Sequence, residues 1–192
     1  YNEGNGKFKE KKLLRFPPVF GASYFELADF NKDGFPDILL TNGDNWDYSR
    51  INKNYHGVRI YLNDGKYNFR EKWFYPLYGT SKAMAADFDM DGDLDIAAIA
   101  FYNTLNNPAN GFVYFSNQGN FNFTPASIPE ATLGKWLTME TGDFDHDGDI
   151  DIVLGSYFHN MEEMRSFISA SGVATFPQLL VLTNNTKVKH DR

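Results

Sequence analysis

The chain has 192 residues and a formal net charge of −7, and 42% of its residues are hydrophobic. This length is sufficient for one domain with a substantial core. The chain contains no cysteine, which excludes a disulfide scaffold and a thiolate metal site. No run of 18 apolar residues occurs, so we expect no transmembrane segment in this chain. The net charge alone neither favours nor excludes nucleic acid, and no nucleic-acid partner is predicted.

The acidic residues are concentrated in three nine-residue loops at 29–37, 87–95 and 143–151, which hold 13 of the 25 aspartates and glutamates. Each loop carries carboxylates or an amide at positions 1, 3, 5 and 9 and glycine at position 6. Ca²⁺ takes about 6–8 oxygen ligands, and a tight loop offers several of them at alternate positions. Because so many carboxylates would otherwise repel one another, the spacing predicts three Ca²⁺ sites, one in each loop.

We expect side-chain ligands from positions 1, 3, 5 and 9 and a main-chain carbonyl ligand from position 7. The predicted ligands are Asp29, Asn31, Asp33, Phe35 and Asp37 in the first loop, Asp87, Asp89, Asp91, Asp93 and Asp95 in the second, and Asp143, Asp145, Asp147, Asp149 and Asp151 in the third. The side-chain ligands of the first site total −3 and those of the other two −4, so the first site is predicted to bind Ca²⁺ most weakly.

The flanking segments exclude an EF-hand, which needs a bidentate glutamate at position 12 and helices on both sides. Position 12 is apolar in all three loops: Leu40, Ala98 and Leu154. Position 2 is phenylalanine each time (Phe30, Phe88 and Phe144), and we expect these rings to pack between neighbouring units. The loops therefore belong to a calcium motif that joins strands.

Short apolar segments surround the loops and predict strands. Segments 24–28, 83–86 and 136–140 precede the loops, and 38–40, 96–99 and 152–154 follow them. Further strands at 58–62, 112–115 and 179–182 run into Asn/Gly turns, which predicts hairpins. Spacings of 58 and 56 residues between the loops give a unit of four strands, which is the size of one propeller blade.

The pattern D-F-[DN]-x-D-G-x-x-D-[IL], followed by an apolar strand and an N-x-G-x-F hairpin, resembles the FG-GAP/VCBS repeat. That resemblance covers nearly all of the chain and implies an all-β fold of β-propeller blades like those of the integrin α-subunit head. We expect about three four-stranded blades and part of a further one, in a segment of a larger, seven-bladed propeller. The approximate repeats are 20–78, 79–133 and 134–192, with 1–19 as the end of a preceding blade. The chain is accordingly expected to be part of a longer one.

The resemblance implies an extracellular or cell-surface calcium-binding scaffold for protein interaction or adhesion. The long loops at 41–57, 101–111 and 155–178 are the expected ligand-binding face, for a protein or a glycan, and the remaining blades of the propeller are the other expected partners. A short amphipathic helix is predicted in the third of these loops, from Met161 to Ile168.

The alternative function is a carbohydrate-binding propeller, either a lectin or a module of a polysaccharide-processing enzyme. Aromatic residues that could stack on sugar rings are Trp46, Tyr48, Tyr55, Trp73 and Trp136. An enzyme is not predicted, because the carboxylates are committed to metal and no phosphate loop, Gly-x-Ser-x-Gly element or histidine cluster occurs. An activity that depended on His56 or His159 would contradict that expectation.

Overall fold

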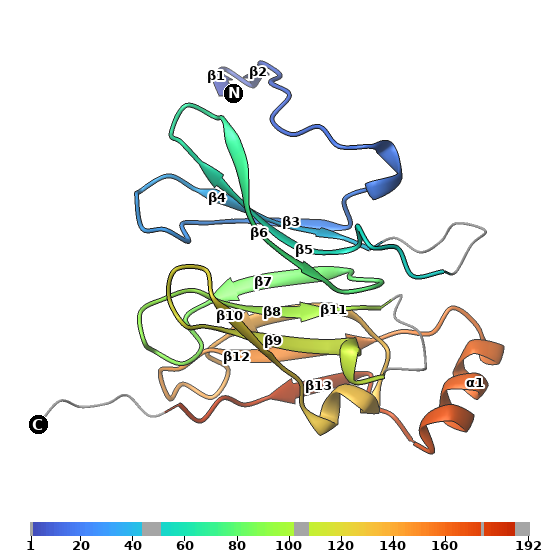
Figure 1. The fold of residues 1–192 in the computed structure, drawn as a ribbon. Helices are drawn as coiled ribbons and strands as arrows, with labels where there is room; N and C mark the ends of the chain where they lie inside the picture. Colours follow the sequence, from blue (N-terminus) through green and yellow to red (C-terminus); the bar gives the residue numbers. More distant parts are fainter. Residues whose placement is uncertain (1, 44–50, 102–107, 174, 187–192) are drawn as a thin grey trace, which may run out of the picture.

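A computed structural model describes residues 2–43, 51–101, 108–173 and 175–186. Within these ranges the protein is mostly β, with four antiparallel sheets and one α-helix (Figure 1). The first large sheet contains β3 (Tyr24–Ala28), β4 (Asp37–Asn42), β5 (Gly57–Asn63) and β6 (Phe69–Pro76). The second contains β7 (Lys82–Ala86), β8 (Asp95–Ile99), β9 (Phe112–Asn117) and β10 (Phe123–Ala126). The third contains β11 (Trp136–Gly142), β12 (Asp151–Ser156) and β13 (Leu179–Leu182).

The three large sheets share one topology, because every strand pairs with its neighbour in sequence in an antiparallel meander. The predicted strands before and after the acidic loops are all confirmed, as are the three hairpin strands that follow them. The apolar runs 38–40, 96–99 and 152–154 lie in β4, β8 and β12, each of which has a paired strand on both sides. All residues of β4 and β8 are buried, as predicted for strands covered on both faces.

Two hydrophobic cores join the three large sheets face to face, and Figure 1 shows the sheets stacked in chain order. The first core lies between the first and second sheets and includes Phe30, Ile60 and Ile96. The second lies between the second and third sheets and includes Phe88 and Leu154. The predicted packing role of the position 2 phenylalanines is therefore confirmed for Phe30 and Phe88.

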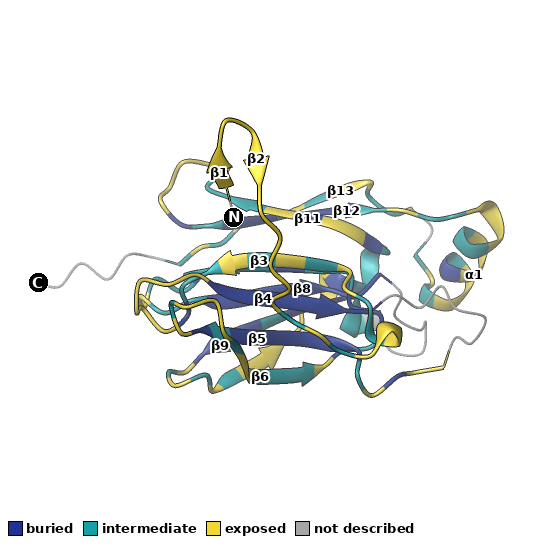
Figure 2. Ribbon diagram, turned by 90° about the horizontal axis from the view of Figure 1, so that it is seen from above, coloured by how far each residue is buried: buried dark blue, intermediate teal, exposed yellow. Residues whose placement is uncertain are grey.

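The outer faces of the first and third sheets carry exposed apolar side chains, and Figure 2 colours much of β3 as exposed. Phe25 and Leu27 of β3 are 62% and 58% exposed, and Leu179 and Val181 of β13 are 69% and 50% exposed. Phe144 is 50% exposed, unlike its two counterparts, because no described sheet packs against the third one on that side. Among the described residues the sheets do not close into a barrel or ring.

Segment 1–19 contributes the small sheet of β1 (Asn2–Gly4) and β2 (Lys7–Phe8), which pair as an antiparallel hairpin. After it, Leu14 and Phe16 pack against the buried residues Ile38, Leu40 and Tyr61 of the first sheet. The chain then passes through the 3₁₀ helix η1 (Pro18–Phe20) into β3. The remaining 3₁₀ helices are η2 (Pro108–Gly111) and η3 (Pro129–Leu133).

The predicted amphipathic helix is confirmed as α1 (Met161–Ser171), which lies at the edge of the stack opposite the acidic loops (Figure 1). The side chain of Asn160 caps its N-terminus by accepting a hydrogen bond from the Glu163 N–H at 2.8 Å. Gly172 ends it in the left-handed conformation, and Phe167 is its buried residue. None of the helices in the described ranges has the length and apolar character that crossing a bilayer requires.

Candidate metal centre

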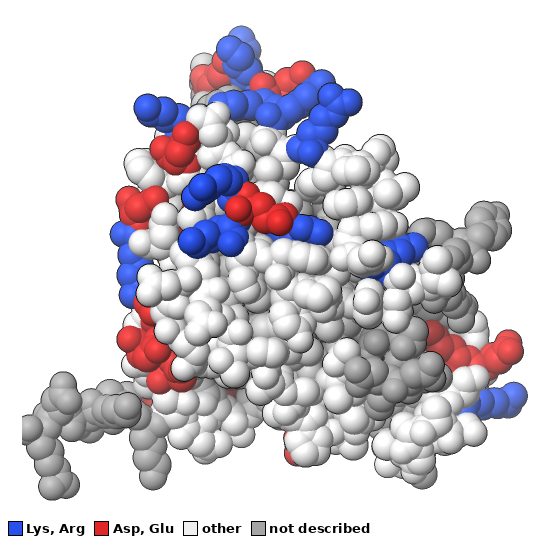
Figure 3. All heavy atoms as spheres, in the orientation of Figure 1, with Lys and Arg blue, Asp and Glu red and all other residues white. Residues whose placement is uncertain are grey.

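The three acidic loops occupy equivalent places, since each joins the first and second strands of a large sheet. They lie along one edge of the stack, at the left of Figure 1. Figure 3 shows acidic atoms along this same edge, with lysine and arginine atoms between them. The stacking of the sheets therefore aligns three acidic turns that are far apart in the sequence.

The backbone of each loop makes two left-handed steps, which fold it into a tight turn. The residues at position 4 have φ angles of 58°, 57° and 64° (Lys32, Met90 and His146). The glycines at position 6 have φ angles of 86°, 94° and 99° (Gly34, Gly92 and Gly148). Glycine adopts this region without steric cost, which explains why position 6 is glycine in every loop.

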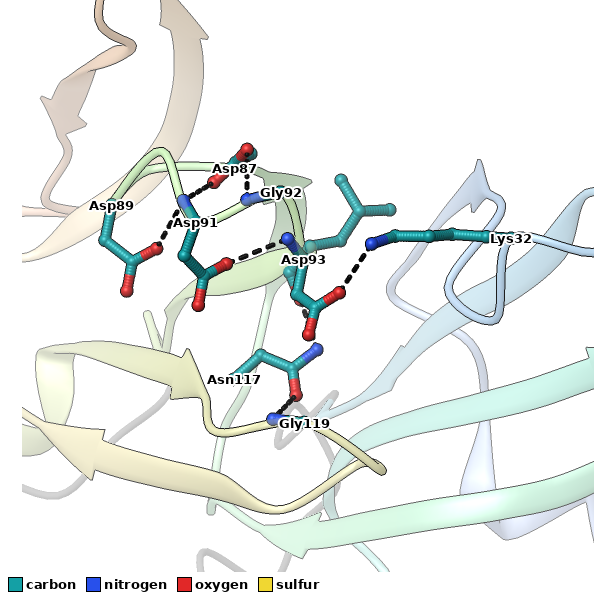
Figure 4. A network of polar contacts seen from close by, with 9 residues as sticks. Lys32, Asp87, Asp89, Asp91, Gly92, Asp93, Asn117 and Gly119 are labelled. Atoms are coloured by element: carbon teal, nitrogen blue, oxygen red, sulfur yellow. Dashed lines mark hydrogen bonds and ion pairs between the residues drawn. The ribbon is translucent and has the colours of Figure 1, made fainter. Parts of the chain in front are cut away.

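The carboxylate at position 1 organises the turn by accepting hydrogen bonds from main-chain N–H groups across it. In the second loop Asp87 accepts from the N–H of Asp91 at 3.0 Å and of Gly92 at 2.9 Å (Figure 4). Asp89 accepts a hydrogen bond from the Asp91 N–H at 3.2 Å, and Asp91 accepts one from the Asp93 N–H at 2.8 Å. The loop therefore directs the side chains of positions 1, 3 and 5 toward one another.

Two of the three loops bring together a group of carboxylates that could hold a metal ion. Asp87, Asp89 and Asp91 each offer an oxygen within 4.8 Å of the others, and so do Asp143, Asp145 and Asp151. Partial desolvation raises the pKa of the Asp145 carboxyl, although this residue is exposed, and the Asp147 carboxylate beside it raises it further. A divalent cation would remove this repulsion between like charges.

The first loop has the same turn but one carboxylate fewer at positions 1, 3, 5 and 9. Asp29 accepts from the N–H groups of Asp33 and Gly34 at 3.1 and 2.8 Å, as in the second loop. At position 3 the Asn31 amide N–H₂ donates to Asp33 Oδ2 at 2.8 Å. Since the amide also offers an oxygen, Asn31 fits a calcium ligand when its side chain is turned, but it adds no charge.

The aspartates at position 9 are completely buried and are held by the protein itself: Asp37, Asp95 and Asp151. Asp95 accepts from the main-chain N–H groups of Phe88 and Asn117 at 3.2 and 2.7 Å, and from the Tyr114 hydroxyl at 2.7 Å. Phe30 and Asn63 make the equivalent bonds to Asp37 at 3.0 and 2.8 Å, and Phe144 and Asn184 make them to Asp151 at 2.9 and 2.8 Å. Burial raises the pKa of the Asp37 and Asp95 carboxyls, which these hydrogen bonds partly oppose. Position 9 therefore ties the first two loops to the third strand of their own sheets, and the third loop to Asn184, just after β13.

Sequence reasoning missed the role of one asparagine in each hairpin: Asn63, Asn117 and Asn184. The side chain of Asn117 donates to the Leu94 carbonyl at 3.0 Å and accepts from the Gly119 N–H at 3.0 Å (Figure 4). The side chain of Asn63 makes the equivalent two hydrogen bonds: it donates to the Pro36 carbonyl at 2.9 Å and accepts from the Gly65 N–H at 3.0 Å. The signal in the sequence is the N-x-G spacing of the first two, which also describes an ordinary hairpin turn, whereas Asn184 is followed by Thr186 in place of glycine.

Position 7 of the loops is predicted to supply main-chain carbonyls, and the three side chains there have different surroundings. The Phe35 ring lies against Gly65, where an added Cβ would be 2.6 Å from it. Asp93 forms an ion pair of 2.6 Å with Lys32 of the preceding loop. Asp149 is 1% exposed, and neither of its carboxylate oxygens has a hydrogen-bond partner among the described residues. The carbonyl ligands themselves stay a prediction.

The donor set of these loops fits a hard divalent cation. It consists of oxygen atoms alone, and in the third loop Asp143 Oδ1 is also buried without a hydrogen-bond partner among the residues described. Hard cations such as Ca²⁺ bind carboxylate and carbonyl oxygens in flexible geometries. Unpartnered buried oxygens are costly unless a cation or proton meets them.

The three described aromatic residues among those predicted to stack on sugars (Tyr55, Trp73 and Trp136) do not form a shared platform. The indole of Trp136 is 1% exposed and donates to the Ala131 carbonyl at 2.9 Å, so its assignment as a stacking residue is wrong. Trp73 packs against Phe115 and Phe123, at ring-centroid distances of 5.5 and 4.7 Å. Tyr55 stacks on Phe20 at 4.4 Å. The other two candidates, Trp46 and Tyr48, lie outside the described residues.

The two histidines considered for catalysis are packed among aromatic rings. His56 is fully buried with its ring edge-on to Tyr55, at 5.1 Å between centroids. The His159 ring lies 5.2 Å from both Phe101 and Tyr157.

Comparison of the chain with protein-family models and with curated proteins finds no match.

Proposed function

We propose that this protein is an extracellular or cell-surface scaffold of the FG-GAP/VCBS type, in which three acidic loops each hold one Ca²⁺. The observation that carries the proposal is the repetition of one polar framework at equivalent places in three sheets. In two loops this framework places three carboxylates within ligand distance of one another. Repulsion between them disfavours the folded loop unless a cation is present.

In this proposal the metal is structural. Ca²⁺ would be held by the side chains at positions 1, 3 and 5, with position 9 closing the loop from beneath. The cation supplies positive charge that offsets the carboxylates, and the chain's own residues fix the turn between the first and second strands of each sheet. A ligand that binds only the folded state at 100 times its Kd stabilises that state by about 2.7 kcal/mol. Sites of millimolar to micromolar affinity are filled continuously outside the cell, which supports an extracellular location.

We further propose that the three stacked sheets are successive blades of a β-propeller. The meander order of each sheet and the two apolar cores between them support this arrangement. The exposed apolar side chains of β3 and β13 are suited to contact with further blades. The long-loop edge, opposite the acidic loops, is the proposed face for a protein or glycan ligand.

Calorimetric titration of chelator-treated protein with CaCl₂ tests the proposal. We expect three binding events and a rise in the unfolding temperature on adding Ca²⁺, and a much smaller rise with Mg²⁺, which requires stricter octahedral geometry. Asp91→Asn and Asp147→Asn should each weaken one event. A protein whose unfolding temperature did not respond to Ca²⁺, and which bound none, would contradict the proposal.

A further inference from the structure

Asp149 differs from its counterpart in the second loop in having no lysine or arginine paired with it among the described residues. The two aspartates occupy position 7 of their loops. Asp93 pairs with the Lys32 ammonium at 2.6 Å, and its side chain is 39% exposed. The residue of the second loop that is equivalent to Lys32 is Met90, which has no positive charge and no hydrogen-bond donor. Asp149 therefore lacks the partner that the repeat supplies to Asp93.

The surroundings of Asp149 are strongly unfavourable for a carboxylate on its own. It is buried, and both of its oxygens are without hydrogen-bond partners in the described part of the chain. The carboxylates of Asp147 and Asp151 lie close enough to repel it, whereas the main-chain N–H of Thr186 opposes that repulsion. An unpaired buried carboxylate is expensive, and two neighbours of the same charge add to the cost. Some positive charge is needed at this point of the loop.

A second buried oxygen indicates where that charge belongs. Asp143 accepts a hydrogen bond from the Gly148 N–H at 3.2 Å through one oxygen, while its other oxygen, Oδ1, is buried without a partner among the described residues. Asp143 also belongs to the group of three carboxylates that could hold a metal ion. Asp149 is not in that group, but its two unsatisfied oxygens and that of Asp143 occur in one nine-residue loop.

We propose that the Asp149 carboxylate is a ligand of the cation held by the third loop. This inference rests on the proposed function and extends it, because position 7 then contributes a side chain in addition to the predicted main-chain carbonyl. The third site would combine five carboxylates, whereas in the second loop Lys32 holds Asp93 and leaves four. Ligand charge is one of the properties that sets Ca²⁺ affinity, so Asp149 strengthens the third site.

The test compares Asp149→Ala with the matched variant Asp93→Ala in the full chain. Both substitutions remove a carboxylate at position 7, but only one of those carboxylates is paired with a lysine. After chelator treatment, CaCl₂ is titrated by calorimetry and unfolding temperatures are measured with and without Ca²⁺. We expect Asp149→Ala to weaken one of the three sites by about tenfold or more, and Asp93→Ala to change every site by less than about twofold. Without Ca²⁺, Asp149→Ala should unfold at or above the wild-type temperature, because a buried unpaired charge has been removed.

Asp149→Asn keeps the shape of the side chain and one oxygen ligand, so it tests the charge if the alanine variant fails to fold. It should weaken the same site by less than alanine does. Three unchanged sites in both Asp149 variants would overturn this inference and leave the proposed function intact, with a proton as the partner of Asp149. Absence of Ca²⁺ binding by the wild-type chain would overturn both.

Discussion

The hairpin asparagine of the second sheet offers a sharp test of how the acidic loop is fixed. Asn117 is 6% exposed, and its side chain makes two hydrogen bonds of 3.0 Å, to the Leu94 carbonyl and from the Gly119 N–H. Asn117→Ala removes both bonds but keeps the main-chain N–H that donates to Asp95 at 2.7 Å. The substitution therefore measures the contribution of the two side-chain hydrogen bonds separately from that of the main-chain bond to Asp95.

The expected cost follows from these two bonds. Each is worth about 0.5–1.5 kcal/mol net, so the free energy of unfolding should fall by about 2 kcal/mol. For a chain of this size that corresponds to a decrease of about 4–8 °C in the unfolding temperature. Urea unfolding at fixed excess Ca²⁺ should show a lower midpoint with an unchanged m-value, since the loss is in stability and not in the surface exposed. The same loss is expected in chelator, because both bonds lie within the protein.

Gln118→Ala is the matched control, one residue further along the same turn. Its amide is exposed and bonds to the Ser116 hydroxyl, at 2.7 Å. We expect a change within about 0.5 kcal/mol. Asn63→Ala should match Asn117→Ala, because Asn63 makes the same two bonds in the first sheet. Equal effects of Asn117→Ala and Gln118→Ala would refute the reasoning.

Three further outcomes are expected. A chelator titration should empty the first site before the other two, so Asp29→Ala should lower the unfolding temperature in Ca²⁺ by less than Asp143→Ala; the reverse order would show that charge count does not decide affinity. Glu26→Gln should stabilise the protein at pH 7. Burial raises the pKa of Glu26 above 4.5, so ionisation of this carboxyl costs stability as the pH rises through its folded-state pKa. The amide oxygen of the substituted side chain can still accept from the Ala85 N–H. That advantage should disappear below pH 4.5 in urea unfolding, and persistence at about pH 3, below the ordinary glutamate pKa, would exclude an electrostatic origin. Trp136→Ala should cost about 3–5 kcal/mol in the free energy of unfolding while leaving any glycan binding by the folded variant unchanged, and selective loss of that binding would restore Trp136 as a ligand residue.

Most of the fold could be predicted because its determinants are local. The apolar runs beside the acidic loops, the glycine at position 6 and the Asn/Gly turns each specify a strand or a turn within a few residues. The periodic position 2 phenylalanine also predicted contact between units, and Phe30 and Phe88 do lie in the cores between the sheets. The arrangement of the three sheets as propeller blades stays a prediction.

Contacts across the stack could not be predicted, because they depend on how the sheets face one another. Lys32 and Asp93 are 61 residues apart, and neither belongs to a recognisable pair in the sequence. The burial of Trp136 depends on the carbonyl of Ala131 in η3, a short helix with no clear sequence signal. An aromatic residue at a strand start can equally be a binding platform or a core residue, and only packing decides between them.

The polar contacts along the acidic edge also connect the loops to one another, and the second loop contacts residues of both neighbouring sheets. Lys32 of the first loop pairs with Asp93 of the second at 2.6 Å. On the other side, the Asn184 side chain of the third sheet donates to the Phe88 carbonyl in the second loop at 2.6 Å. The second loop is thus held from both neighbouring sheets, and its own hairpin holds it through Asn117.

A loop that is held in shape before it binds a cation loses less conformational freedom on binding. Residues of both neighbouring sheets help to hold the second loop. We therefore expect loss of the ion to disturb this loop less than it disturbs the other two, and loss of a neighbouring sheet to disturb it more than loss of the ion. The hydrogen bonds from the hairpins therefore contribute to the geometry of the acidic edge. In the proposed Ca²⁺-bound state, the cation would offset charge in a turn that these hydrogen bonds already shape.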